Sequence, residues 1–208
     1  VISRLYSPQI KELYGQYDLI IACGDLPYYY LEFIVTMLTV DVLYVYGNHD
    51  KTRYTSDGRE VTRAEGCTLM EDQTGVYNGL IFAGLGGSMR YHPKAVNQYT
   101  EFEMWRRILK LAPRLLMNKL RYGRYLDVLI THSPPFGIHD DTDLPHRGFK
   151  SFLKFMDFFK PRYLLHGHQH LYRNNATRVS RYGQTTIVNV YPKMDFDWTP
   201  EEFGLERF

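Results

Sequence analysis

The sequence predicts a mixed α/β domain with parallel strands at its centre and antiparallel hairpins beside them. Short apolar runs alternate with segments of helical periodicity in both halves of the chain, which is the pattern of strand–helix–strand units. Two dipeptides, Asn78-Gly79 and Gly183-Gln184, each separate two apolar runs, which indicates two hairpins. A chain of 208 residues is short enough for one domain, so we expect residues 1–208 to form a single unit.

The first part of the chain predicts a strand, a helix and a second strand. Residues 18–23 form a short apolar run that ends at a glycine, residues 28–38 carry apolar side chains three and four positions apart, and residues 42–46 form another apolar run. Because short connections join these segments, we expect the two strands to lie parallel with a right-handed crossover.

The remaining strands follow the same logic. Residues 75–77 and 80–83 flank the first turn dipeptide, and residues 177–182 and 185–190 flank the second. Between the two hairpins, a strand at 127–131, a helix at 149–159 and a strand at 163–166 resume the alternation.

Residues 100–121 predict one long amphipathic helix. Pro113 lies inside it and is expected to break or kink it, because proline lacks a backbone N–H and clashes with the preceding turn. Basic residues occur along the whole segment, and we interpret them as a solvated face rather than a nucleic-acid-binding stripe.

The composition limits the classes of partner. With 25 Lys and Arg against 23 Asp and Glu, the net charge of +2 is too balanced to favour nucleic acid or a membrane surface. No apolar run approaches the roughly 18 residues that a membrane helix needs. The two cysteines, Cys23 and Cys67, form no CxxC motif, and no basic-then-apolar leader is present, so we expect a cytoplasmic location.

Polar motifs stand where four predicted strands end. They are Gly24-Asp25, Gly47-Asn48-His49-Asp50, Thr131-His132-Ser133-Pro134-Pro135 and Gly167-His168-Gln169-His170. Oxygen and imidazole ligands gathered at strand ends are a common way for an α/β fold to build a metal site. The chain therefore predicts a hydrolytic metal centre.

The last motif leaves a geometric question open. His168 and His170 are two residues apart, so in an extended segment their side chains would point to opposite sides. A tight loop after Gly167 would instead aim both at one centre. His166, which belongs to the strand before them, is interpreted as a core residue.

In this order, the motifs resemble the calcineurin-like metallophosphoesterase superfamily. The resemblance extends from Asp18 to Val190, and the GNHD and GHQH strings together are specific, whereas Gly-Asp alone is not. The segment from His132 to Phe149 is most similar to the small branch with a Thr-His-x-Pro-Pro motif, some members of which act on phosphodiesters, including cyclic nucleotides. The resemblance implies a four-layer α/β/β/α sandwich of two mixed sheets flanked by helices.

The resemblance also implies a set of metal ligands. Asp25 would bridge two divalent ions. Asn48, His132 and His168 would complete one site, and His170 would contribute to the other. Imidazole, amide and carboxylate ligands suit Mn, Fe, Zn or Ni without choosing among them.

The same resemblance gives roles to residues that are not ligands. His49 would protonate the leaving oxygen or stabilise the transferring phosphoryl group, and Asp50 would orient His49. The loop at residues 138–148 is the expected source of specificity, with His146 and Arg147 as substrate-binding candidates because a guanidinium matches a phosphate. The alternative for this loop is a helix-capping segment with surface ion pairs.

One motif of the family is absent from the chain. Its Asp-x-His motif precedes Gly-Asp, but here no Asp precedes Asp18 and no His precedes His49. We expect this motif and the first strand to lie upstream of Val1. The alternative is a degenerate site that lacks two ligands.

We therefore expect a phosphoesterase that hydrolyses a small phosphorylated substrate, first of all a phosphodiester, with water activated by two metal ions. The alternative from a different class is a non-catalytic scaffold or binding module with the same fold, against which the presence of His49 argues. A DNA-repair nuclease is the third hypothesis, and the near-neutral charge argues against it. The sequence does not indicate the oligomeric state.

Overall fold

The structure is a computed structural model that describes residues 1–169 and 177–198. Its helices are η1 (Ser3–Leu5), α1 (Ile10–Tyr14), α2 (Tyr28–Leu38), α3 (Glu101–Tyr122) and α4 (Lys150–Phe159). Its strands are β1 (Leu19–Ala22), β2 (Asp41–Tyr44), β3 (Arg53–Tyr54), β4 (Glu60–Val61), β5 (Thr68–Leu69), β6 (Thr74–Tyr77), β7 (Leu80–Leu85), β8 (Ser88–Met89), β9 (Gln98–Tyr99), β10 (Val128–Thr131), β11 (Tyr163–His166), β12 (Val179–Tyr182) and β13 (Thr185–Asn189).

The strands form two main sheets. The smaller has the order β1-β2-β5 and the larger the order β12-β13-β11-β10-β7-β6. Strands β7, β10, β11 and β13 run parallel, while β6 and β12 add antiparallel hairpins at the two edges, as the turn dipeptides predict. The larger sheet is therefore mixed, but in the described residues the smaller sheet is entirely parallel, which corrects the expectation of two mixed sheets.

Side chains alternate between layers along the strands of both sheets. In β2, Val42 and Tyr44 join a core with α1 and α2, while Leu43 and the following Val45 join a core shared with the larger sheet. In β10, Val128 and Ile130 face that shared core, and Leu129 faces α3 and α4. This period of two places one apolar layer between the sheets and one outside each sheet.

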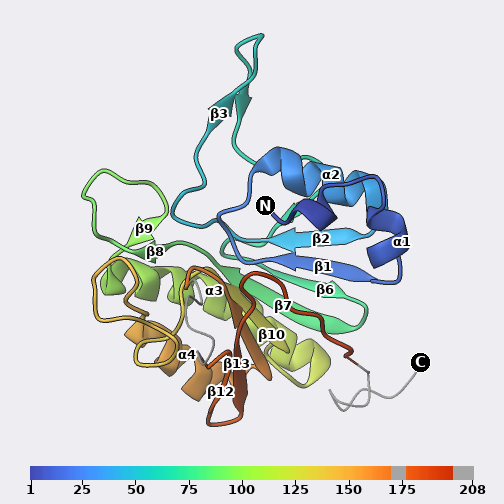
Figure 1. Cartoon of the computed structure of the whole chain (residues 1–208). Coiled ribbons are helices and arrows are strands. Elements are labelled where there is room, and N and C mark those ends of the chain that lie inside the picture. Colours follow the sequence, from blue (N-terminus) through green and yellow to red (C-terminus); the bar gives the residue numbers. More distant parts are fainter. Residues whose placement is uncertain (170–176, 199–208) are drawn as a thin grey trace.

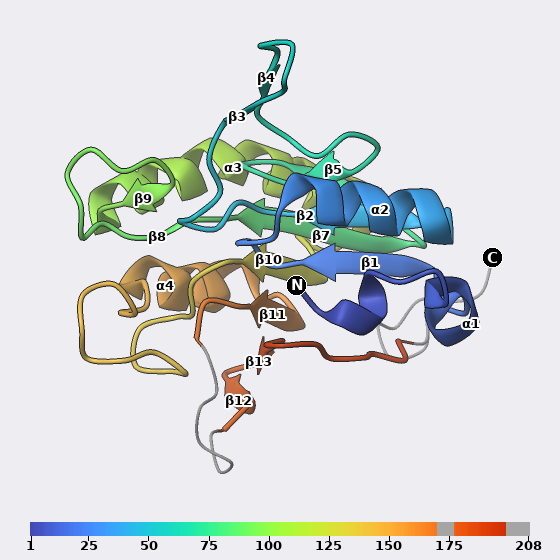
Figure 2. The ribbon, with the colours of Figure 1, turned by 45° about the horizontal axis from the view of Figure 1, so that its top comes forward.

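The pictures agree with this layering. Figure 1 shows α2 beside β1 and β2, with β6 and β7 of the larger sheet next to them. The short β3–β4 hairpin projects away from the body of the molecule, as both Figure 1 and Figure 2 show. The α/β class that the sequence predicts is confirmed.

Helix α3 corrects half of one expectation: Pro113 does not break the helix, while a kink at this proline stays a prediction. The helix runs from Glu101 to Tyr122 with Pro113 inside. Pro113 is exposed, so water can solvate the carbonyl group that its missing N–H leaves without a partner. A capping box between Thr100 and Glu103 closes the first turn. Across the described ranges 1–169 and 177–198, no helix combines the length and apolar character that crossing a bilayer requires.

Candidate metal centre

The parallel strands β1 and β2 bring Asp25 beside Gly47. Ala22 pairs with Tyr44 in the register of these strands, so the residues that follow leave the sheet side by side. The approach is close enough that a Cβ atom on Gly47 would lie 2.0 Å from Asp25 Oδ1. Glycine at this position therefore allows the two loops to meet at the carboxyl ends of the strands.

Asp50 joins the same two loops through their backbones. Its Oδ2 accepts hydrogen bonds from Gly47 N at 2.7 Å and Asp25 N at 3.0 Å. Asp25 Oδ1 in turn accepts from His49 N at 2.8 Å. Burial raises the pKa of the Asp50 carboxyl, although both N–H groups favour its charged form. These partners of Asp50 are backbone groups, so its expected orientation of the His49 ring stays a prediction.

His132 enters the site from the larger sheet, directly after β10, and is fully buried. Its Nδ1 lies 2.7 Å from Cys23 O, which can only accept, so this nitrogen carries a proton and donates it. Its Nε2 lies 3.0 Å from Asn48 Oδ1 and 3.3 Å from Asp25 Oδ2. The Cys23 carbonyl group, at the end of a smaller-sheet strand, thus fixes which nitrogen of His132 faces Asp25 and Asn48.

His168 follows β11 in a left-handed conformation, with a φ of 62°. Its Nε2 lies 2.8 Å from Pro145 O, so Nε2–H donates there and Nδ1 is left for a ligand. Gln169 N donates to Gly167 O at 2.7 Å, so a tight turn follows Gly167, while the direction of the His170 side chain stays a prediction. One ligand atom each of Asp25, His132 and His168 lies within 4.8 Å of the others.

The charge pattern of this cluster fits a cation. Burial lowers the pKa of His132, but the hydrogen bond and charge of Asp25, the Cys23 carbonyl group and the charge of Asp50 together outweigh burial and raise this pKa overall. Although burial acts in the opposite direction, the same pair lowers the pKa of Asp25 to about 2. Three electron-pair donors, on Asp25, Asn48 and His132, therefore surround a point that a positive charge must fill, as a proton or as a metal ion.

His168 is prepared for ligation by its surroundings. Burial, followed by the neighbouring charge of His132, lowers its pKa to about 4. Its ring is therefore neutral near neutral pH, which is the form that binds metal.

The other predicted residues occupy different positions. His49 is exposed and, together with Asp25, His132, His168 and His146, lines a cavity of about 1310 Å³. His146 Nδ1 lies 2.8 Å from Asp143 Oδ2, and its ring centroid lies 5.1 Å from that of His168.

Two predicted residues are not part of this group. Arg147 lines a second hollow of about 700 Å³ with Phe136 and Lys150, and its Nη2 donates to Thr142 O at 3.2 Å. It does not line the first cavity as far as the described residues define it. His170 lies outside the described residues.

Sequence reasoning missed several groups that support the ligands. Tyr91 Oη accepts from Asn48 Nδ2 at 3.1 Å, and no local signal points to it because 43 positions separate the two residues. The carbonyl groups of Cys23 and Pro145 carry no sequence signal at all. The Asp143–His146 pair is different, because its spacing of three residues is a pattern that the sequence displays.

Comparison with known proteins identifies the family. The model of the calcineurin-like phosphoesterases matches residues 4–172, which is most of the chain. The chain belongs to the calcineurin-like phosphoesterase family. This calcineurin-like phosphoesterase is 26% identical over 201 residues to an uncharacterized protein of Methanocaldococcus jannaschii, MJ1162, covering 91% of this chain and 84% of that protein.

A solved structure supports the fold. The crystal structure of TT1561 from Thermus thermophilus matches this calcineurin-like phosphoesterase with a TM-score of 0.52 at 12% identity, covering 88% of this chain and 80% of that one. Family membership makes the chain a metal-dependent phosphoesterase, which is a hydrolase, and the group of Asp25, His132 and His168 agrees with the divalent metals that the family uses.

Proposed function

We propose that this protein hydrolyses a small phosphodiester, such as a cyclic nucleotide or another nucleotide-like ester, with a dinuclear metal site. The observation that carries this proposal is the convergence of Asp25, His132 and His168 in one cavity that also contains His49. The Asn48 amide oxygen joins this group 3.0 Å from His132 Nε2. Two strand ends of each sheet supply these residues, so the site forms only when both sheets pack together.

The described ligands account for one ion, with Asp25, Asn48, His132 and His168 as its donors. Asp25 is proposed to reach a second ion as well, together with His170. When bound, the two ions would supply Lewis acidity for the phosphoryl charge and a water made nucleophilic at neutral pH.

His49 is proposed to act on the leaving group. Its backbone N–H is tied to Asp25 Oδ1 at 2.8 Å, while its side chain borders the cavity. An imidazole in this position can donate a proton to the departing oxygen as a general acid.

His146 is the stronger of the two substrate-binding candidates. Asp143 accepts from its Nδ1, which leaves Nε2 for a phosphate oxygen in the shared cavity. Arg147 lies in the second hollow and donates to Thr142 O. We therefore propose that Arg147 helps to hold the 138–148 loop, and that it touches only a substrate large enough to reach that hollow.

The test pairs metal analysis with hydrolysis of bis(4-nitrophenyl) phosphate and 4-nitrophenyl phosphate in the presence of Mn²⁺. A His49→Ala variant should lose about 100- to 10,000-fold in turnover, the usual contribution of general acid catalysis, while its metal content stays that of the wild type. His92→Ala, a change at an exposed histidine, serves as the matched control and should keep full turnover.

Three results would contradict the proposal. Equal loss of metal and turnover in His49→Ala would make His49 a ligand. A wild-type protein that binds no metal and cleaves neither ester would be a scaffold instead of an enzyme, and faster cleavage of the monoester would replace the diester substrate with a monoester.

A further inference from the structure

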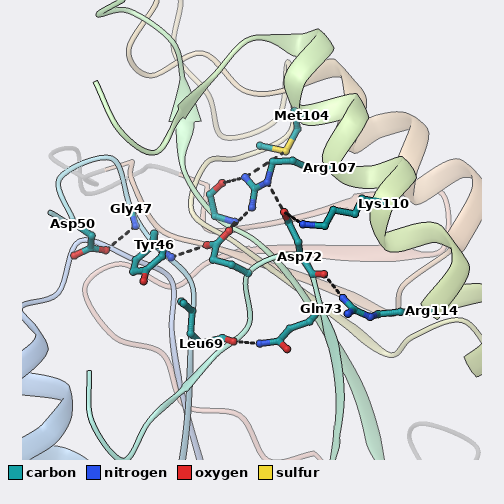
Figure 3. A network of polar contacts seen from close by, with 12 residues as sticks. Tyr46, Gly47, Asp50, Leu69, Asp72, Gln73, Met104, Arg107, Lys110 and Arg114 are labelled. Carbon is teal, nitrogen blue, oxygen red and sulfur yellow. Dashed lines mark hydrogen bonds and ion pairs between the residues drawn. The ribbon is translucent and has the colours of Figure 1, made fainter. Parts of the chain in front are cut away.

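A buried ion-pair network connects α3 to the loop that carries Asn48. Arg107, on α3, pairs with Glu71 Oε2 and donates from Nε to Asp72 Oδ1 at 2.7 Å and from Nη1 to Gly86 O at 2.7 Å. The side chains of Arg107 and Glu71 are only 10% and 16% exposed. Figure 3 shows Arg107 reaching from its helix toward the strand ends, with Asp72 on one side and Tyr46 beyond.

The network ends on the backbone just before the metal-binding motif. Glu71 Oε1 accepts from Tyr46 N at 2.8 Å, and Tyr46 O accepts from Gly87 N at 2.7 Å. Strand β2 ends at Tyr44, so both backbone groups of Tyr46 are held outside sheet pairing. The next residue, Gly47, donates to Asp50, a contact that Figure 3 also draws.

The fit around Glu71 leaves no free space. A Cβ atom on Gly86 would lie 2.1 Å from Glu71 Oε1 and 2.3 Å from Tyr46 O. Gly86 N also donates to Glu71 Oε2 at 3.3 Å. The carboxylate therefore receives N–H groups from two loops and the guanidinium from α3, and its position determines that of Tyr46.

We propose that Glu71, held in place by Arg107, is a positioning residue that sets the backbone of Tyr46 and thereby places the Asn48 amide oxygen for metal binding. This rests on the proposed function in that Asn48 is taken as a ligand. Partners that orient a metal ligand through hydrogen bonds commonly control affinity as strongly as some ligands do.

The chain contains a matched control for this arrangement. At the other end of β7, Asp127 Oδ2 accepts from Ile81 N at 2.7 Å, and Arg124 Nε donates to Asp127 Oδ1 at 2.7 Å. The chemistry is the same, a carboxylate that holds a backbone N–H and is paired with an arginine. Roughly 17 Å of strand separate it from Gly86, so it cannot touch the metal ligands.

The experiment compares Glu71→Gln with Asp127→Asn in the full chain. Each amide would place its NH2 group against an N–H donor, so both variants should unfold at lower temperature in chelator. Only Glu71→Gln should weaken the affinity of the metal-free protein for Mn²⁺, by about 10-fold in titration calorimetry. Only Glu71→Gln should also move the amide signals of residues 47–50 in nuclear magnetic resonance spectra of the metal-free protein.

The results separate this inference from the proposed function. The positioning role of Glu71 would be overturned if Glu71→Gln left both the Mn²⁺ affinity and the amide signals unchanged, whatever the stability of the variant. If the wild type binds no Mn²⁺ but Glu71→Gln still shifts the amide signals of residues 47–50, the positioning role is supported and the proposed function is refuted. Should Glu71→Gln fail to fold, Arg107→Lys keeps the charge but loses the planar fork. It should also weaken Mn²⁺ binding, and an unchanged affinity would count against the proposal.

Discussion

His166 illustrates how a single side chain is fixed by its partners. The sequence predicts that His166 is a core residue, and it is fully buried. Burial lowers its pKa to about 3. Its Nδ1 donates to Gly167 O at 3.0 Å, so its Nε2 accepts from His139 Nδ1 at 2.9 Å. His139 Nε2 then accepts from Ser180 Oγ at 2.8 Å. This chain of bonds fixes the ring orientations directly before the His168 loop.

The neutral state of His166 and His168 predicts acid instability of the metal-free protein. Both have folded pKa values far below the ordinary histidine value of about 6.5, so the unfolded chain binds more protons as the pH falls. The free energy of unfolding should drop by about 1 kcal/mol or more per pH unit between about pH 6 and pH 4. Asp25, with its pKa of about 2, extends the loss below pH 4.

Urea unfolding in chelator across this pH range measures the effect. His132 has the opposite sign, because its raised pKa stabilises the fold below about pH 6.5 and this contribution is lost as the pH rises through the raised value. A His166→Asn variant should show a shallower acid slope than the wild type. A stability that is flat from pH 7 to pH 4 would show that these imidazoles are not held neutral.

At the scale of the element, α3 shows what local sequence predicts well and poorly. Apolar periodicity predicts the helix at residues 100–121, and the structure begins it with a capping box of Thr100 and Glu103 and ends it at the left-handed Gly123. The effect of Pro113 depends on what surrounds it. Ile108, Leu111 and Leu115 are buried against the larger sheet and stabilise the helix on both sides of the proline.

Replacing this proline should stabilise the protein. Proline inside a helix destabilises the folded state by about 3 kcal/mol relative to alanine. The unfolded chain with alanine has more conformational freedom, which lowers the expected gain in stability by about 1 kcal/mol. Pro113→Ala should therefore raise the free energy of unfolding by about 2 kcal/mol in urea titrations. Pro93→Ala, in an exposed turn, is the control and should give no gain. No gain from Pro113→Ala would mean that the helix is already relaxed around its proline.

At the scale of the whole molecule, the metal centre links the two sheets. Asp25 and Asn48 follow strands of the smaller sheet, while His132 and His168 follow strands of the larger one. The bond from His132 to Cys23 O already crosses between them. A bound ion would therefore add a further connection between two sheets that an apolar layer and a few hydrogen bonds already hold together.

Metal removal should lower the thermal stability of the whole domain. Mn²⁺ at about 100 times its dissociation constant adds about 2.7 kcal/mol to the folded state, which corresponds to roughly 5–10 °C for a chain of this size. Differential scanning fluorimetry with chelator and then with excess Mn²⁺ measures the shift. A His132→Ala variant should show none of it, and a wild type that does not respond to saturating Mn²⁺ would refute the metal centre.

Local sequence patterns were enough to predict the α/β class, the hairpins at Asn78-Gly79 and Gly183-Gln184, and the strand-end positions of Asp25 and His132. Each of these depends on periodicity or turn chemistry within a few residues, which can be read directly from the sequence. The contact between His146 and Asp143 is also local, because the two residues are only three positions apart.

Which atoms face the metal centre depends instead on how the chain packs. The tautomer of His132 depends on a carbonyl group 109 positions away, and the placement of Tyr46 depends on Glu71 and on Arg107 of a distant helix. Packing also placed Arg147 outside the cavity that contains His146. Such contacts arise when two sheets and their helices come together, and because they join residues through space, no spacing along the chain encodes them.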